Sequence, residues 1–133
     1  MSKLINSIRE AIRLADLRDG MTVSFHHHLR NGDFVLNMVM DQIAQMGIRD
    51  LTVNASSLFD VHMPLLEHIK NGVVTGVAAA YIGGGLGREI SKGILEKPVE
   101  FRTHGRRPVD IASGRTPIDV AFIAAPAADC RGN

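Results

Sequence analysis

The chain has 133 residues, of which 45% are apolar, which is enough for one hydrophobic core and too few for two ordinary domains. Its 15 Lys and Arg against 14 Asp and Glu give a net charge of +1, which offers no broad electrostatic basis for binding nucleic acid or an anionic membrane. One cysteine excludes an internal disulfide, and no uncharged apolar run reaches about 18 residues. We therefore expect a soluble, cytoplasmic protein with a single domain over residues 1–133.

Helical and extended segments alternate along the chain, with short connections between them. Apolar residues at a helical period predict helices over residues 3–17, 33–46, 65–70 and 88–95, and a weaker signal adds a short one over 108–113. Short apolar runs predict extended segments over residues 21–25, 51–55, 73–80, 98–103 and 118–124. This alternation favours an α/β fold, with an open, predominantly parallel sheet and helices on both of its faces.

Polar chemistry is most concentrated directly after the first predicted strand, in His26, His27, His28, Arg30 and Asn31. In an open α/β sheet, ligands collect beyond the carboxyl ends of the strands. Imidazole, guanidinium and amide groups supply hydrogen-bond donors for an anion, and the next helix can point its first N–H groups the same way. The sequence therefore predicts an anion site here. The alternative that a single histidine only satisfies backbone groups at the sheet edge stays open.

Three adjacent histidines also suggest a metal site, but the geometry of a strand argues against one. Successive side chains point to opposite faces, so at most His26 and His28 can converge. No Cys-x-x-Cys, His-Glu-x-x-His or carboxylate-rich loop accompanies them, and Cys130 lies far along the chain. We therefore expect no bound metal.

A glycine-rich segment, Gly83-Gly84-Gly85-Leu86-Gly87, is expected as a loop between a strand and a helix that begins near Arg88. Glycines allow backbone N–H groups to approach a phosphate or carboxylate closely. The spacing matches neither Gly-x-Gly-x-x-Gly nor a nucleotide-binding P-loop, so a flexible turn is the alternative.

Two further polar segments follow predicted strands. Ser56 and Ser57 come at the end of the strand expected over 51–55, where their hydroxyls can cap a turn or face a ligand. The segment from Thr103 through His104 to Arg107 carries two arginines that can clamp a carboxylate, with a solvated basic turn as the alternative. Polar groups thus recur at four equivalent places, and this recurrence predicts a single crevice.

Four segments carry a more specific pattern: Val23-Ser24-Phe25-His26-His27-His28-Leu29-Arg30, Asn37–Met40, His68–Thr75 and Ile118–Pro126. In their order, and over nearly the whole chain, they resemble the α subunit of citrate lyase, the citrate CoA-transferase. The resemblance implies a CoA-transferase-like fold and exchange of an acetyl thioester for a citryl thioester. It implies citrate and acetyl-CoA or an acyl-carrier thioester as substrates, no tightly bound cofactor, and the citrate lyase β and acyl-carrier subunits as partners.

Under this resemblance, the polar segments line a crevice for the anionic substrate. The expected substrate-binding residues are His26, His27, His28, Arg30, Asn31, Ser56, Ser57, Gly83, Gly84, Gly85, Gly87, His104 and Arg107. Their expected task is orientation and charge neutralisation around a mixed anhydride. The family commonly has a second glycine where Arg106 stands. We assign no catalytic residue.

Family members are much longer and contain two related halves, so the resemblance implies that residues 1–133 form an incomplete first half. A non-catalytic binding or assembly module on the same fold is the alternative. A metal-dependent hydrolase that uses the histidines is a third hypothesis. Exposed edges of an incomplete sheet also predict self-association into a homo-oligomer.

Overall fold

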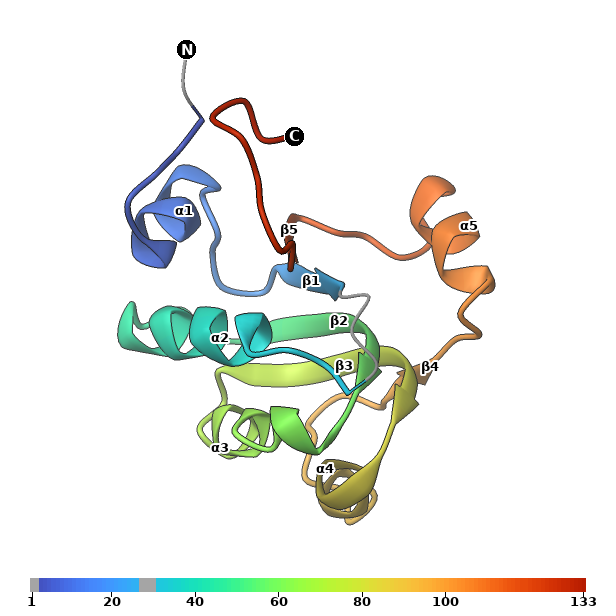
Figure 1. The fold of residues 1–133 in the computed structure, drawn as a ribbon. Coiled ribbons are helices and arrows are strands. Elements are labelled where there is room, and N and C mark those ends of the chain that lie inside the picture. The colour runs from blue at the N-terminus through green and yellow to red at the C-terminus, as the bar shows by residue number, and fades with distance from the viewer. Residues whose placement is uncertain (1–2, 27–30) are drawn as a thin grey trace.

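A computed structural model describes residues 3–26 and 31–133 (Figure 1). The strands are β1 (Thr22–His26), β2 (Leu51–Leu58), β3 (Val74–Ile82), β4 (Glu100–Phe101) and β5 (Val120–Ile123). The helices are α1 (Ile8–Leu14), α2 (Val35–Gln45), α3 (Leu65–Lys70), α4 (Gly84–Ile90) and α5 (Arg106–Ala112), with a 3-10 turn η1 (Asp60–His62). The described strands form one sheet in the order β4-β3-β2-β1-β5, and all its pairings are parallel. The predicted α/β fold is confirmed.

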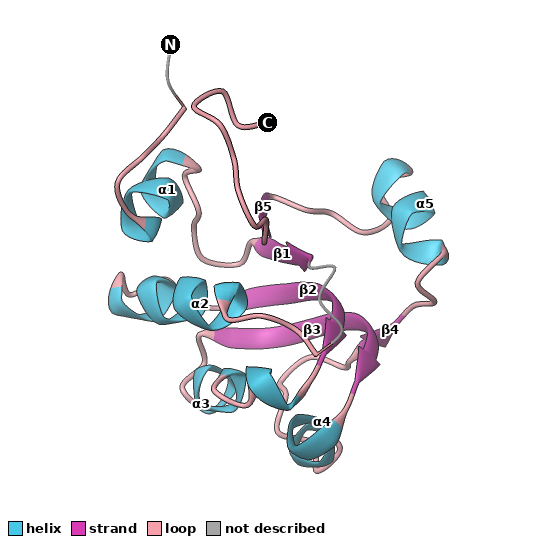
Figure 2. Cartoon of the chain, in the orientation of Figure 1, coloured by secondary structure: helices cyan, strands magenta, loops and turns pink. Residues whose placement is uncertain are grey.

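The order of the strands places the helices on two faces of the sheet. From β1 to β4 each strand is added on the same side of the previous one, so right-handed connections put α2, α3 and α4 on one face. The chain then returns across the sheet to β5, which puts α5 on the opposite face. Figure 2 shows α2, α3 and α4 along one side of the sheet and α5 across from them. The sheet therefore has one face covered by several helices and one face approached by α5.

The hydrophobic core lies between the sheet and α2, α3 and α4. Alternate residues of β1, and of β2 as far as Ala55, point into it, and they form one cluster with Leu58 and the apolar side of α2. The buried members from these three elements are Val23, Phe25, Leu36, Val39, Met40, Ile43, Leu51, Val53, Ala55 and Leu58. Full burial of one such large side chain stabilises a fold by about 1.5–3 kcal/mol. This packing fixes β1 and β2, which carry the polar residues of the other face.

Most elements differ from their predicted bounds by one or two residues, and three differ by three residues or more at one or both ends. The first helix begins at Ile8, not at residue 3, because Ser7 is its N-cap and Ser7 Oγ accepts a hydrogen bond from the Glu10 N–H at 3.1 Å. Strand β2 continues three residues past Ala55, because Leu58 still pairs with Ile82 of β3. Helix α4 begins at Gly84, well before Arg88. Helix α3 has the predicted bounds.

No helix in the described part of the chain is both long enough and apolar enough to cross a lipid bilayer.

Candidate anion-binding site

Arg107, in the first turn of α5, reaches two inner strands of the sheet, β1 and β2. Its Nε–H donates to Asn54 Oδ1 at 3.0 Å, and its Nη2 donates to Ser24 Oγ at 2.7 Å. Ser24 and Asn54 are register neighbours on β1 and β2, and both are buried. Because side chains alternate along a strand, Ser24 and Asn54 face away from the apolar core. Arg107 therefore lies on the polar face of the sheet.

Among the described residues, Arg107 has only neutral hydrogen-bond partners. The side chains that it contacts are an amide and a hydroxyl, and it forms no ion pair within residues 3–26 and 31–133. Burial lowers the pKa of the Arg107 guanidinium from its ordinary value, but arginine keeps its proton at neutral pH. A half-buried cation with neutral partners attracts an anion more strongly than an exposed one. The local electrostatics thus suit a carboxylate ligand.

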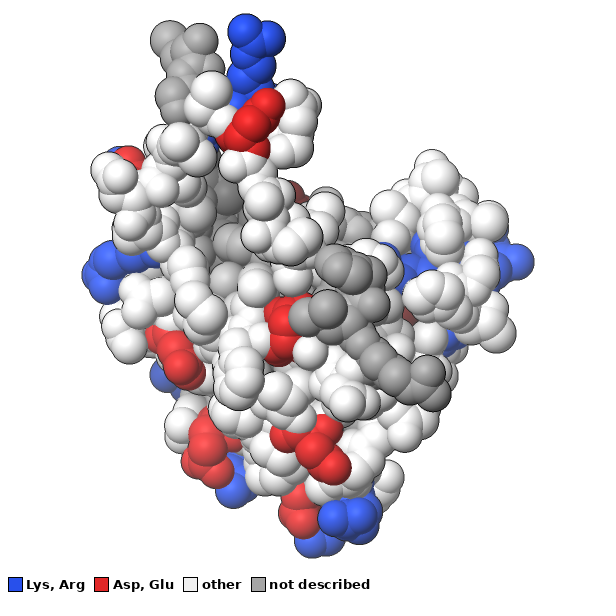
Figure 3. Space-filling view, viewed as in Figure 1, with Lys and Arg blue, Asp and Glu red and all other residues white. Residues whose placement is uncertain are grey.

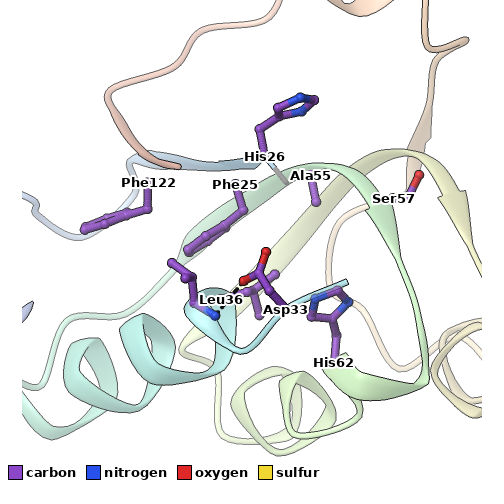
Figure 4. Close-up of a pocket in the computed structure, with 9 residues that line it drawn as sticks. Phe25, His26, Asp33, Leu36, Ala55, Ser57, His62 and Phe122 are labelled. Atoms are coloured by element: carbon purple, nitrogen blue, oxygen red, sulfur yellow. Dashed lines mark hydrogen bonds between the residues drawn. The ribbon is translucent and has the colours of Figure 1, made fainter. Parts of the chain in front are cut away.

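Two histidines lie on the same side of the sheet. His26 is the last residue of β1, and its ring centroid is 6.4 Å from that of His104, which shortly precedes α5. Figure 4 shows the His26 ring pointing away from Phe25, and alternation along β1 places it on the same face as Ser24. The structure thus brings together His26, His104 and the chain segment that carries Arg107. Three of the expected residues, His27, His28 and Arg30, lie outside the described residues.

Ser56 and Ser57 do not sit at a strand end, so that part of the prediction is wrong. Both lie inside β2, where pairing with β3 continues to Leu58. Because successive side chains of a strand point to opposite faces, the two serines lie on different faces of the sheet. Ser56 is buried and shares the face of Asn54, whereas Ser57 lines a cavity of about 10 Å³ on the α2 side (Figure 4). Of the two serines, only Ser56 lies on the face of the sheet where Arg107 contacts Ser24 and Asn54, which we call the Arg107 face.

His62 is a buried residue that the sequence analysis missed. Its side chain lines the same small cavity as Asp33 and Ser57, and its exposed fraction is 1%. His62 Nδ1 accepts a hydrogen bond from the Phe59 N–H at 3.0 Å. Gly32 has φ +84°, and a Cβ there would come within 2.7 Å of His62 Cε1. The only sequence signal for His62 is its position shortly after a strand, because nothing in its spacing marks it.

The glycine-rich segment is not a loop that precedes a helix near Arg88, because four of its residues belong to α4. Asp60 explains the early start: its Oδ1 accepts a hydrogen bond from the Gly85 N–H at 2.8 Å. Gly84 has φ +61°, and a Cβ there would overlap the Asp60 carboxylate. The negatively charged carboxylate of Asp60, from η1, thus lies against the start of α4. This charge disfavours an anion at that point.

Asn31, Gly83 and Gly84 do converge, around a hollow of about 270 Å³ whose other walls include Asp60 and Tyr81. This hollow follows the carboxyl ends of β2 and β3, whereas Arg107 contacts residues in the middle of β1 and β2. The hollow and Arg107 belong to different sides of the sheet, because α4 and α5 lie on opposite faces. The structure therefore separates Asn31, Gly83 and Gly84 from Arg107. Among the described residues, 3–26 and 31–133, the hollow contains the negative charge of Asp60, whereas the contacts of Arg107 are neutral.

Within the described ranges, 3–26 and 31–133, no three His, Cys, Asp or Glu side chains are grouped so that they could hold a metal ion. Cys130 is exposed. His27 and His28 lie outside these ranges, so the expectation of no metal stays a prediction.

Comparison with known proteins identifies the family. The family model "Citrate lyase, alpha subunit (CitF)" matches residues 1–133. The citrate lyase α chain of Haemophilus influenzae is 52% identical over 131 residues, which is 98% of this chain and 26% of that protein. The citrate lyase α chain of Escherichia coli is 51% identical over the same shares.

A solved structure agrees with these sequence relatives. A crystal structure from Streptococcus mutans, assigned as a citrate lyase α subunit in complex with citrate, has a TM-score of 0.96 and 52% identity. All of this chain aligns with that structure, and the aligned part is 26% of the length of the Streptococcus mutans chain. The chain thus spans about a quarter of the length of the relatives that it matches. The resemblance stated from the sequence is confirmed, and the chain belongs to the citrate lyase α subunit family.

Proposed function

We propose that this chain binds citrate on the Arg107 face of the sheet, as part of a citrate CoA-transferase reaction. The observation that carries the proposal is the half-buried Arg107 guanidinium, whose contacts with Ser24 and Asn54 fix its position without neutralising it. Citrate is a tricarboxylate, and a guanidinium fork pairs with carboxylates in a bidentate geometry. The citrate-bound relative from Streptococcus mutans, with 52% identity, supports the same ligand here.

The proposed reaction exchanges one acyl group for another in two steps. A citrate carboxylate oxygen attacks the carbonyl carbon of an acetyl thioester, the C–S bond breaks, and the thiolate leaves with the electron pair. The thiolate then attacks the citryl carbonyl of the mixed anhydride, the C–O bond breaks, and acetate leaves. Both steps develop negative charge on a carbonyl oxygen, so nearby cationic and N–H donors lower the barrier.

In this proposal the residues of the Arg107 face bind and orient citrate. Arg107 pairs with one carboxylate that does not react, and His26 and His104 donate hydrogen bonds to another. Ser24 and Asn54 hold the guanidinium in place, which reduces the entropy lost on binding. The thioester is carried by CoA or by an acyl-carrier subunit, and a β subunit acts on the citryl thioester. These further assignments rest on the family.

Isothermal titration of the 133-residue chain with citrate tests the proposal. We expect Arg107→Gln to weaken citrate binding by about ten-fold or more, or about 1.4 kcal/mol. Arg107→Lys should lose part of the affinity, because lysine keeps the charge but not the fork. Arg13→Gln, an exposed charge on α1, is the matched control. Equal citrate affinity in Arg107→Gln and Arg13→Gln, with both variants folded by circular dichroism, would contradict the proposal.

A second assay on the same protein distinguishes the transferase role from the non-catalytic alternative. The chain is incubated with acetyl-CoA and citrate, and citryl thioester is measured. Citrate binding together with exchange supports the transferase role for this chain. Citrate binding without exchange supports a binding or assembly module.

A further inference from the structure

Asp110 of α5 is a buried carboxylate that gathers three arginines from different parts of the chain. Its side chain is 1% exposed, and Arg102 Nη1 donates to its Oδ2 at 2.8 Å. Arg106 Nε lies 2.9 Å and Arg115 Nε 3.4 Å from its Oδ1. Arg102 precedes α5, Arg106 begins it and Arg115 follows it. Asp110 therefore fixes the position of three guanidinium groups, which we call the Asp110 arginine cluster.

This cluster carries an excess of positive charge. The three arginines stand against Asp110 and against Glu100, whose Oε2 lies 2.7 Å from Arg102 Nη2, so together they carry a formal charge of +1. With Arg107, residues 100–115 carry +2, whereas the whole chain carries +1. The positive charge of the molecule is thus concentrated here, and the remaining residues together are negative. Figure 3 shows basic side chains, in blue, projecting from the side of the molecule where Figure 1 places α5. Arg106 and Arg115 are each about half exposed, at 51% and 55%, so a ligand can reach them.

The cluster also has more hydrogen-bond donors than acceptors. Arg102 Nε and Thr116 Oγ1 are buried, and neither has a hydrogen-bond partner among the described residues. Thr116 adjoins the cluster, because its N–H donates to the Asp110 carbonyl oxygen at 3.0 Å. Buried polar groups are rarely left unpaired in native structures. The half-exposed guanidinium groups of Arg106 and Arg115, with the surplus of positive charge, suit an acceptor-rich anion.

We propose that the Asp110 arginine cluster binds the phosphate groups of the CoA moiety of the thioester substrate. Guanidinium forks match phosphate oxygens, and a phosphate monoester carries about −1.5 to −2 charges, so the surplus positive charge of the cluster attracts it. The identity of the phosphate carrier rests on the proposed function, but binding of phosphate groups does not. The cluster flanks Arg107 on α5, so it places the CoA phosphates beside the proposed citrate site.

Calorimetric titration of the 133-residue chain with CoA, and separately with inorganic pyrophosphate, tests the inference. In the double variant Arg106→Gln/Arg115→Gln, we expect CoA affinity to fall by about ten-fold or more. The fold should persist, because Arg102 still pairs with Asp110. The matched control is Arg9→Gln/Arg13→Gln, which removes two exposed charges from α1 and should change CoA affinity by less than about two-fold.

A second variant separates ligand binding from a structural role. Thr116→Val removes a buried hydroxyl that has no partner among the described residues. It should leave thermal stability unchanged or raised and should weaken CoA binding. Equal CoA affinity in the cluster variant and the α1 control would overturn the inference. Tighter binding of poly-L-glutamate than of pyrophosphate would also overturn it, in favour of an acidic protein partner.

Different results would contradict the citrate proposal and the cluster proposal. Loss of citrate binding in Arg107→Gln with CoA binding retained supports distinct subsites, as proposed. If citrate binding depends on Arg107 while CoA and pyrophosphate do not bind, only the cluster inference is overturned. If pyrophosphate and CoA bind at the cluster while citrate does not bind, only the proposed function is overturned.

Discussion

Asp110 shows how opposing effects set the charge state of a single buried side chain. Burial by itself raises the pKa of the Asp110 carboxyl. Hydrogen bonds from Arg106 and Arg102 outweigh burial, so its pKa lies below the ordinary value of 3.8. The carboxylate is therefore ionised at neutral pH and holds the arginines around it. A group with a lowered pKa in the folded state stabilises the fold above its unfolded pKa and loses that effect on acidification.

We expect the Asp110→Asn variant to be less stable than the parent at neutral pH and less sensitive to acid. Its amide cannot balance the three arginines. Thermal unfolding followed between about pH 3 and pH 7 measures both effects. The parent should lose stability as the pH falls below about 4 through the lowered pKa of Asp110, and the difference between the two proteins should shrink there. Parallel curves of thermal stability against pH for parent and variant would show that ionised Asp110 does not stabilise the fold.

At the scale of elements, the start of α4 depends on a residue from a distant part of the chain. Asp60 of η1 accepts the Gly85 N–H and lies against Gly84. Glycines disfavour a helix in isolation. The helix begins among them because Asp60 satisfies a donor and because Gly84 adopts the left-handed conformation.

We expect Gly84→Ala to destabilise the fold by about 1–3 kcal/mol, since its φ is unfavourable for alanine and its Cβ would overlap Asp60. Gly93→Ala is the control. Gly93 also has a positive φ, but a Cβ there would meet nothing within 4 Å. Urea unfolding of both variants isolates the effect of the overlap. Equal losses of stability would mean that the contact with Asp60 adds nothing beyond backbone strain.

A comparison of helices α3 and α4 shows what the sequence could predict. Helix α3 has the predicted bounds because its signals are local: Pro64 at its start and Asn71-Gly72 at its end. Helix α4 was placed too late because its cap, Asp60, comes from a separate segment. Strand β2 was placed too short because Ser56 and Ser57 look like a polar strand end, while their pairing with β3 is decided by the neighbouring strand.

The candidate site was predictable to a similar extent. His26, His104 and Arg107 were expected together because they follow strands of one parallel sheet. Their partners Ser24 and Asn54 were not expected, because a pattern of apolar and polar residues does not reveal which face a returning helix covers. The separation of the glycine segment from Arg107 also depends on the strand order, which local periodicity does not contain.

At the scale of the whole molecule, the sheet ends in two short strands. β4 and β5 stand at its edges and contain two and four residues. Phe101 on β4 and Ile123 on β5 are 65% and 71% exposed. A sheet edge with an exposed apolar side chain favours pairing with another chain. Self-association through the β5 edge thus stays a prediction of the structure.

We expect Ile123→Lys to reduce self-association of this chain, because a charge on an edge strand opposes edge-to-edge pairing. Leu14→Lys is the control, since Leu14 is also exposed but lies at the end of α1, away from the sheet edge. Sedimentation velocity over a range of concentrations measures the effect. A concentration dependence that both variants share with the parent would argue against the β5 edge as the contact.

The central claim is that citrate binds at the guanidinium that Ser24 and Asn54 hold. The most direct measurement is the NMR signal of the Arg107 Nε–H during a citrate titration, together with the backbone amides of Ser24, Asn54 and Gly85. We predict saturable shifts at Arg107, Ser24 and Asn54, and little change at Gly85, where Asp60 already accepts the N–H. Saturable shifts at Gly85 with an unchanged Arg107 signal would contradict the claim.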